Sequence, residues 1–123
     1  MDVIHVCLNV SDADRIAQWY IDELGYEETW GFTTADGKTR NVYVADGNGL
    51  ELQLSDTEGQ DDLEPGTAYD HFAVKVDNVD EAFEDIENHG VVKEPGDQPA
   101  AGARTAMIKD PDGHIVELVE PVE

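Results

Sequence analysis

The sequence predicts an α+β fold built from two βαβββ modules, each forming a curled mixed sheet. Two observations support this prediction. The chain resembles itself at a shift of 66 residues, so that residues 5–10 fall on 71–76 and residues 50–52 on 116–118. Within each half, apolar residues alternate as in a strand, then follow a helical period, and then alternate again. We therefore expect a single domain over residues 1–123, with module one at 1–56, a linker at 57–66 and module two at 67–123.

Each half begins with an alternating strand that leads into an amphipathic helix. In the first half the strand 3–10 precedes Ser11 and Asp14, which predict a capping arrangement, and Gly25 ends the helix. In the second half the strand 70–76 precedes a helix over 78–89. The remaining strands are expected at 26–33, 39–45 and 49–54, and again at 91–94, 104–109 and 114–120.

One stretch of the second half has no clear period. Residues 94–103 contain two prolines and two glycines and alternate neither as a strand nor as a helix. Such a segment forms either a flap over a site or a plain surface connection, and the sequence leaves both alternatives open.

The composition narrows the possible partners and the compartment. The formal net charge is -22, from 29 acidic and 7 basic residues, and such a surface repels nucleic acid and anionic membranes. This balance resembles that of proteins from salt-loving organisms, where salt screens the self-repulsion. The single Cys7 allows no disulfide within the chain, and no transmembrane or signal-peptide pattern is visible. We therefore expect a cytoplasmic protein.

Two histidine and glutamate pairs are the strongest candidates for a site. His5 and Glu51 are 46 residues apart, and so are His71 and Glu117. Strand alternation places all four side chains opposite the apolar residues that pack on the helices. Imidazole nitrogens and carboxylate oxygens are ligands of divalent transition metals. A single shift relates all four residues, which favours a metal site over four unrelated solvated side chains.

Three further residues with reactive side chains lack this support. His89 lies near a helix end and His114 beside a turn, and neither has a histidine at the shifted position, so we expect both at the surface. Cys7 shares the face of His5. It is either a small apolar residue of the interior or part of the lining of a cavity.

Two motifs connect this pattern to a known family. Residues 66–71 read Gly-Thr-Ala-Tyr-Asp-His, and residues 110–113 read Asp-Pro-Asp-Gly shortly before Glu117. With these motifs, nearly the whole chain resembles the vicinal oxygen chelate superfamily and, within it, the glyoxalase I (lactoylglutathione lyase) family. The Asp-Pro-Asp-Gly ending is shared across the superfamily. The Gly-Thr-Ala-Tyr run and Glu51 as a second ligand are closer to bacterial-type glyoxalase I.

The resemblance implies a metal-dependent lyase that acts as a homodimer with a shared site. It implies octahedral Ni²⁺ or Zn²⁺, with Co²⁺ or Mn²⁺ as other possibilities, held by His5, Glu51, His71 and Glu117. The substrate would be the hemithioacetal of methylglyoxal and a thiol, which is isomerised to a lactoyl thioester. By the same resemblance Glu117 would be the base that moves the proton between adjacent carbons, with Glu51 as its symmetric partner.

Four residues are candidates for binding the substrate. Asn9 and Ser55 stand where glyoxalase I usually has an Arg and an Asn that hold glutathione, so another thiol, such as γ-glutamylcysteine, is an alternative. Lys75 lies on the face of the metal ligands, and Arg104 opens a strand beside residues 94–103. Either cation would suit a carboxylate of the thiol, although ordinary surface charge is an alternative for both.

Other activities of the superfamily are alternatives. Extradiol dioxygenases typically use three protein ligands, and methylmalonyl-CoA epimerases tend to carry Gln at the position of Glu51. Metal-free binding proteins of the bleomycin-resistance type generally lack the complete set of four ligands. The retention of all four therefore favours a glyoxalase-like lyase.

Overall fold

The computed structural model describes residues 1–60, 62–64 and 66–122, which contain eight strands and two α-helices. The chain divides into two compact units, residues 1–64 and 65–123. Each unit holds one four-stranded mixed sheet and one α-helix, which confirms the predicted α+β class. None of the described helices is both long and apolar enough to span a bilayer.

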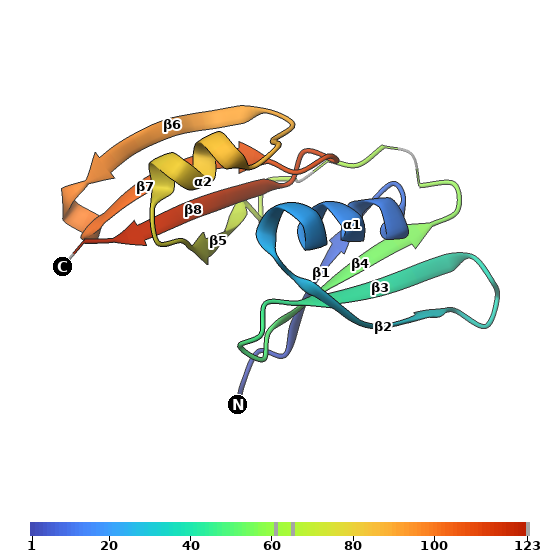
Figure 1. Cartoon of the computed structure of the whole chain (residues 1–123). Coiled ribbons are helices and arrows are strands. Elements are labelled where there is room, and N and C mark those ends of the chain that lie inside the picture. The colour runs from blue at the N-terminus through green and yellow to red at the C-terminus, as the bar shows by residue number, and fades with distance from the viewer. Residues whose placement is uncertain (61, 65, 123) are drawn as a thin grey trace. The chain divides into compact units, whose positions relative to one another are not determined.

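The first unit places one helix on one face of its sheet (Figure 1). The strand order is β1-β4-β3-β2, with β1 parallel to β4 and the other neighbours antiparallel. Buried Ile16 and Tyr20 of the helix and Val42 and Leu54 of the sheet contribute to the core between these layers. The elements are β1 (His5–Asn9), α1 (Ala13–Leu24), β2 (Glu27–Thr33), β3 (Thr39–Ala45) and β4 (Glu51–Thr57).

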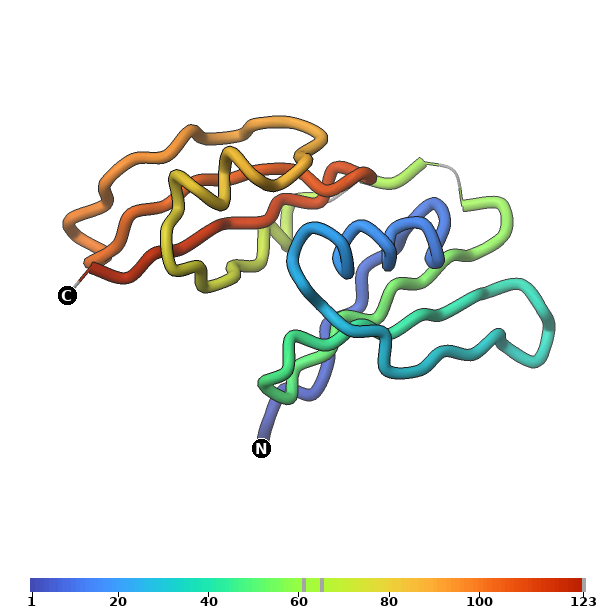
Figure 2. Tube along the Cα trace, viewed as in Figure 1, coloured from blue at the N-terminus to red at the C-terminus, as the bar shows by residue number. Residues whose placement is uncertain are grey.

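The second unit repeats this arrangement with a shorter helix (Figure 2). Its strand order is β5-β8-β7-β6, again with one parallel and two antiparallel pairs. Val79 of the helix and Ile108 and Leu118 of the sheet are fully buried. The elements are β5 (His71–Lys75), α2 (Val79–Asp85), β6 (Val91–Gln98), the 3-10 helix η1 (Pro99–Ala101), β7 (Ala103–Lys109) and β8 (Ile115–Pro121). In both units the face opposite the helix is called the open face below.

The helix boundaries differ from the prediction at two points. The cap of α1 is Asp12, whose carboxylate accepts a hydrogen bond from the backbone N–H of Arg15 at 3.1 Å, so the predicted Ser11 cap is wrong. The helix α2 ends at Asp85 rather than at residue 89. Ile86 leaves the helix in an extended conformation, with φ -75 and ψ 128, and is 9% exposed. The burial of this side chain accompanies the early helix end.

Residues 94–103, for which a flap and a plain surface connection were both open, consist mostly of regular structure. Residues 94–98 continue β6 and pair with β7, for example Gly96 with Thr105 and Gln98 with Ala103, and the 3-10 helix follows directly. The register shifts between Lys93 and Gly96, which explains why the segment shows no strand alternation in the sequence.

The two halves repeat with two different shifts rather than one. His5 in β1 and His71 in β5 are 66 residues apart, but the paired strands that follow the helices match at a shift of 64. His5 is therefore the partner of Glu51 in the parallel pair, whereas His71 is the partner of Ile115. Glu117 lies two residues further along. The prediction that Glu51 and Glu117 occupy equivalent points is wrong, because the segment between β5 and β7 is two residues shorter than that between β1 and β3.

The turns before β4 and β8 give independent support for the shift of 64. The carboxylate of Asp46 accepts a hydrogen bond from the backbone N–H of Asn48 at 2.7 Å, and Asp110 accepts one from Asp112 at 2.9 Å. A shift of two residues keeps a side chain on the same face of a strand. Glu51 and Glu117 therefore both remain on the open face of their own sheet.

Candidate metal and substrate site

The open face of the first unit carries a row of polar pairs. In the parallel register of β1 and β4, His5 pairs with Glu51, and Asn9 pairs with Ser55. Neighbouring strands lie about 4.8 Å apart, so the imidazole and the carboxylate of the first pair start side by side. Asn9 and Ser55, the two predicted substrate contacts in this unit, are likewise brought together on the same face.

An aromatic stack borders the first pair. The ring of Trp30 lies on the ring of Tyr43, with centroids 4.2 Å apart and planes 11° from parallel, and Phe32 extends the stack. The His5 ring meets Tyr43 edge to face, at 5.8 Å and 84°. Such a T-shaped contact is favourable and helps to orient the imidazole. Trp30 and Phe32 are 50% and 38% exposed, so the stack offers an apolar surface next to the candidate ligands.

In the second unit, His71 lies between two carboxylates. His71 Nδ1 lies 2.5 Å from Asp70 Oδ2, and His71 Nε2 lies 3.2 Å from Glu117 Oε1. The hydrogen bond with Asp70 is the largest cause that raises the pKa of His71, partial burial opposes it, and the charge of Glu117 raises it further. The imidazolium form is thereby favoured in the protein without metal. A metal ion bound to this nitrogen would have to displace the proton.

The side chains present suit a divalent transition metal. A metal-ligating histidine usually has its other ring nitrogen engaged by a carboxylate, as Asp70 engages Nδ1 of His71. Each unit supplies one imidazole and one carboxylate, the donors that Ni²⁺ and Zn²⁺ accept. Within the described part of the chain, no group of three or more His, Cys, Asp or Glu side chains is arranged so that it could hold a metal ion. The four residues are found as two pairs, and their convergence stays a prediction.

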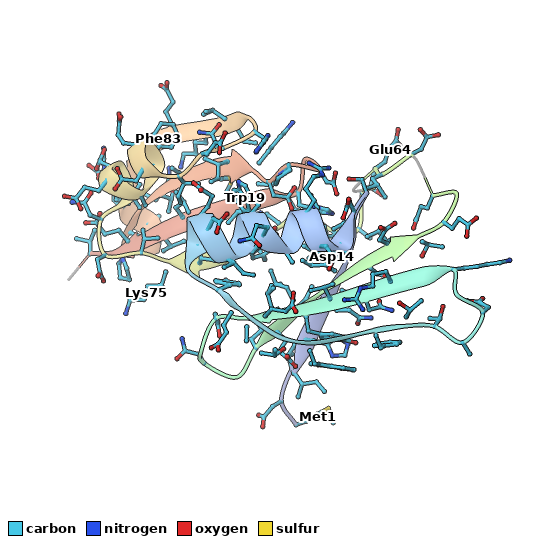
Figure 3. The ribbon with its side chains drawn as sticks, turned by 45° about the vertical axis from the view of Figure 1, so that its right-hand side comes forward. Met1, Asp14, Trp19, Glu64, Lys75 and Phe83 are labelled. Atoms are coloured by element: carbon cyan, nitrogen blue, oxygen red, sulfur yellow. The ribbon has the colours of Figure 1, made fainter. Side chains whose placement is uncertain are left out.

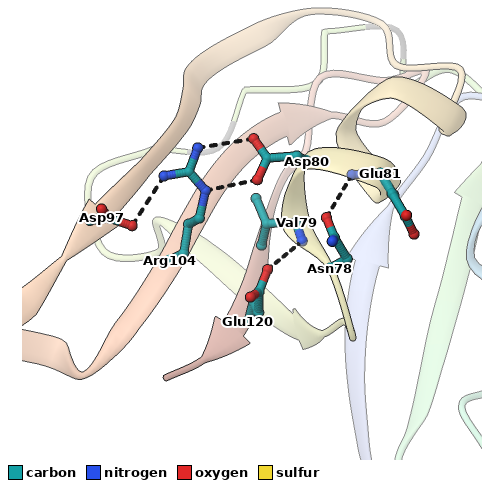
Figure 4. A network of polar contacts seen from close by, with 7 residues as sticks. All are labelled: Asn78, Val79, Asp80, Glu81, Asp97, Arg104 and Glu120. Atoms are coloured by element: carbon teal, nitrogen blue, oxygen red, sulfur yellow. Dashed lines mark hydrogen bonds and ion pairs between the residues drawn. The ribbon is translucent and has the colours of Figure 1, made fainter. Parts of the chain in front are cut away.

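Lys75 and Arg104 lie on opposite faces of the second sheet. Lys75 ends β5 on the open face, two residues from Ala73, the partner of Glu117, and its exposed side chain projects from the strand (Figure 3). Arg104 instead lies on the helix side, where its guanidinium binds both oxygens of Asp80 at 2.8 and 2.9 Å and reaches Asp97 at 3.1 Å (Figure 4).

The contacts of Arg104 are those of a residue that stabilises the fold. The bidentate pair ties the first turn of α2 to β7, and it holds the pKa of the Asp80 carboxyl below its usual value. Arg40 and Asp14 form the counterpart in the first unit, with 3.7 Å between Nη2 and Oδ1. Because two carboxylates already engage the guanidinium, we leave Arg104 out of the proposed substrate site.

Sequence reasoning missed three residues on or beside the open faces. Lys93 pairs with Met107, itself the partner of Glu117, and its Nζ donates to Thr105 Oγ1 at 2.8 Å. Trp30 and Thr29 lie at a bulge in β2. The sequence contains one indication of the aromatic surface. The spacing of Trp30 and Phe32 puts two aromatic residues on one face of a strand that is exposed throughout.

The two remaining histidines behave differently from each other. His89 is exposed, as predicted. The prediction that His114 is a surface residue is wrong, since its side chain is 13% exposed and its Nδ1 lies 2.8 Å from Oδ2 of the fully buried Asp110. The same carboxylate accepts the backbone N–H of His114 at 2.9 Å. His114 therefore completes the turn before β8.

Comparison with known proteins identifies the family. The sequence model of the Glyoxalase/Bleomycin resistance protein/Dioxygenase superfamily matches residues 3–118. The chain belongs to this superfamily. Superfamily members similar to it include the lactoylglutathione lyase of Escherichia coli O157:H7, which is 35% identical over 127 residues, with 98% of this chain and 93% of that protein covered.

Solved structures of the superfamily agree in fold. Glyoxalase I from Zea mays matches with a TM-score of 0.85 and 26% identity, over 98% of this chain and 45% of the maize chain. The chain thus spans less than half of the maize protein. A trypanothione-dependent glyoxalase I from Leishmania major matches with a TM-score of 0.81 and 27% identity, over 98% of this chain and 86% of the other.

Proposed function

We propose that this chain is a metal-dependent lyase of the glyoxalase I type, which isomerises the hemithioacetal of methylglyoxal and a thiol to a lactoyl thioester. The observation that carries the proposal is the presence of two His/Glu pairs, one on the open face of each sheet. The similarity to lactoylglutathione lyases over nearly the whole of both chains supports it.

His5, Glu51, His71 and Glu117 are the proposed ligands of one divalent ion, Ni²⁺ or Zn²⁺, with Co²⁺ and Mn²⁺ as substitutes. We expect the chain to act as a homodimer with a shared site. The ion would supply stabilisation of the negative charge that develops on the two neighbouring oxygens of the substrate. The protein's own part is to present two neutral imidazoles and two carboxylates on rigid strands.

Glu117 is the proposed base. It takes the proton from the carbon that carries the sulfur and returns it to the adjacent carbon, so that the alcohol carbon becomes the thioester carbonyl and the former ketone becomes the lactate hydroxyl. Two observations support Glu117 for this role. Its side chain is only 20% exposed, and its partner among the described residues is His71, which can exchange this contact for another ligand.

The thiol is proposed to be bound through groups on both open faces. Asn9 and Ser55 offer an amide and a hydroxyl, while Lys75 and Lys93 offer cations for a carboxylate. The Leishmania major relative uses trypanothione, so members of this superfamily differ in their thiol. We expect glutathione or a close analogue such as γ-glutamylcysteine, in a cytoplasmic enzyme adapted to high salt, in line with the net charge of -22.

One assay tests the proposal directly. The purified protein is stripped of metal, reconstituted with Ni²⁺ or Zn²⁺ at high salt, and supplied with methylglyoxal and each of several thiols. We expect about one ion per chain and formation of the lactoyl thioester, followed by its ultraviolet absorbance. A protein that binds none of Ni²⁺, Zn²⁺, Co²⁺ and Mn²⁺ contradicts the proposal.

The aromatic stack favours one second candidate, a metal-free binding protein. Trp30 and Phe32 present exposed rings next to Tyr43, and such a surface suits a planar apolar ligand. This candidate predicts quenching of tryptophan fluorescence by aromatic compounds in metal-stripped protein, with no thioester formed under any metal. The proposed lyase predicts turnover in the same sample once metal is restored.

A further inference from the structure

A bulge in β2 brings a hydroxyl group to one of the two candidate ligand carboxylates. Glu28 pairs with Val44 and Trp30 pairs with Tyr43, so Thr29 is an extra residue opposite two consecutive residues of β3. A bulge of this kind changes the direction of a side chain, and bulges are frequent beside active sites. The Thr29 hydroxyl donates a hydrogen bond to Glu51 Oε2, while the carbonyl oxygen of Tyr43 lies 3.4 Å from it.

The strand β3, which lies between Thr29 and Glu51, leaves room for their contact. Glu51 lies in β4, and β3 separates β4 from β2. At the register of Glu51 the residue of β3 is Ala45, which is the partner of both Glu27 and Glu51. A methyl group is small enough for the Thr29 side chain to reach across to the carboxylate.

We infer that Thr29 is a positioning residue for Glu51, which holds one carboxylate oxygen so that the other stays available to a metal ion. The inference rests on the proposed function. A threonine hydroxyl donates a single hydrogen, and a hydrogen bond to an ionised carboxylate is stronger than one between neutral groups. Ligating carboxylates are commonly fixed by such outer hydrogen bonds.

The second unit has the same bulge without the hydroxyl. The register of β6 shifts between Val91 and Lys93, opposite Ile108 and Met107, so Val92 occupies the point that corresponds to Thr29. Glu117 lies two residues beyond the position of Glu51 and contacts His71 instead. Among the described residues, a hydroxyl thus holds Glu51 but not Glu117. This assigns Glu51 to a fixed position in the metal site and Glu117 to the transfer of the proton.

The test compares two replacements of Thr29 in the full-length protein. Thr29→Val removes the hydroxyl and keeps the shape, which also copies the bulge of the second unit, whereas Thr29→Ser keeps the hydroxyl. Zn²⁺ affinity is measured by competition with a chelating dye, a readout that does not depend on turnover. We expect Thr29→Val to weaken Zn²⁺ binding about 10-fold or more and Thr29→Ser to change it by less than about 2-fold.

Matched controls separate this inference from the proposed function. Val92→Thr should leave Zn²⁺ affinity unchanged, because no carboxylate ligand is predicted within its reach. If Thr29→Val is poorly folded by circular dichroism, Thr29→Ala gives the second measurement without a hydroxyl. Wild-type protein that binds no ion overturns the proposed function itself. If the wild-type protein binds Zn²⁺ and forms the thioester, two results overturn only the role of Thr29. One is a Zn²⁺ affinity of Thr29→Val equal to that of the wild type, and the other is a Zn²⁺ affinity of Thr29→Ser as weak as that of Thr29→Val.

Discussion

The two units share one topology but hold their candidate ligands differently. In the first unit His5 and Glu51 are direct partners in the parallel strand pair, and a threonine and a tyrosine ring orient them. In the second unit His71 reaches Glu117 across an offset of two residues, and a further carboxylate engages the other ring nitrogen. Duplication has therefore preserved the face on which each ligand lies without preserving its position along the strand.

The physical reason lies in the strand geometry. Removal of two residues between a helix and the next hairpin slides the hairpin but does not turn its side chains over, since side chains alternate with a period of two. The structural counterpart of Glu117 is Gln53, and that of Glu51 is Ile115. Because they lie at different positions along their strands, the two carboxylates can take different chemical roles.

The largest expected effect is on turnover. Glu117→Gln keeps the size of the side chain and should preserve the fold, but it removes the proposed base, so we expect kcat to fall by about 10²- to 10⁴-fold. Glu51→Gln should instead act mainly on metal affinity, because Glu51 is the carboxylate that Thr29 holds. The measurements are steady-state thioester formation and metal content at saturating metal. If a high metal concentration restored kcat in Glu117→Gln while Glu51→Gln stayed inactive, the roles of base and fixed ligand would be reversed between the two residues.

The hairpin turns provide the next comparison. Asp110 is fully buried and accepts hydrogen bonds from the backbone of Asp112 and from both the backbone and ring of His114. Its removal in Asp110→Ala leaves these donors without their acceptor, so we expect a loss of roughly 2 to 4 kcal/mol in the free energy of unfolding. Asp46 is exposed and accepts a hydrogen bond from the backbone of Asn48, so Asp46→Ala should cost below about 1 kcal/mol. Urea unfolding measures both, and equal losses would contradict the unequal roles of the turns.

A third experiment isolates the carboxylates around His71. The hydrogen bond with Asp70 is the largest single cause that raises the pKa of His71, and the charge and hydrogen bond of Glu117 raise it further. Asp70→Asn should therefore lower this pKa, as followed by NMR titration of the metal-free protein. Because folding raises the pKa, the associated stabilisation is present below the unfolded value of about 6.5 and is lost as the pH rises through the folded value. The difference in the free energy of unfolding between wild type and Asp70→Asn should therefore shrink as the pH rises. A difference that grows with pH would contradict the role of Asp70 in raising the pKa of His71.

The sequence was sufficient for the fold and for the face of each ligand, and insufficient for their registers. Alternation around His5 and His71 predicts the open faces because a buried apolar face fixes the parity of a strand. Residues 50–52 resemble 116–118 in sequence, and an Asp-Gly pair precedes each glutamate, but Asp46 corresponds in the turn to Asp110 and not to Asp112. The contact between Thr29 and Glu51 has no counterpart among the described residues of the other half of the chain. It depends on a bulge in β2 that sequence periodicity does not reveal.

The smallest expected effect concerns the ion pairs that tie each helix to its sheet. Arg104 binds Asp80 through two hydrogen bonds, whereas Arg40 lies 3.7 Å from Asp14, and all of these groups are partly exposed. Exposed pairs contribute little, so we expect Arg104→Ala to lower the free energy of unfolding only slightly and Arg40→Ala by less still. Added salt should reduce both losses, because it screens charges at the surface. Neither change should alter KM for the thiol, and a raised KM in Arg104→Ala alone would return this arginine to the substrate site.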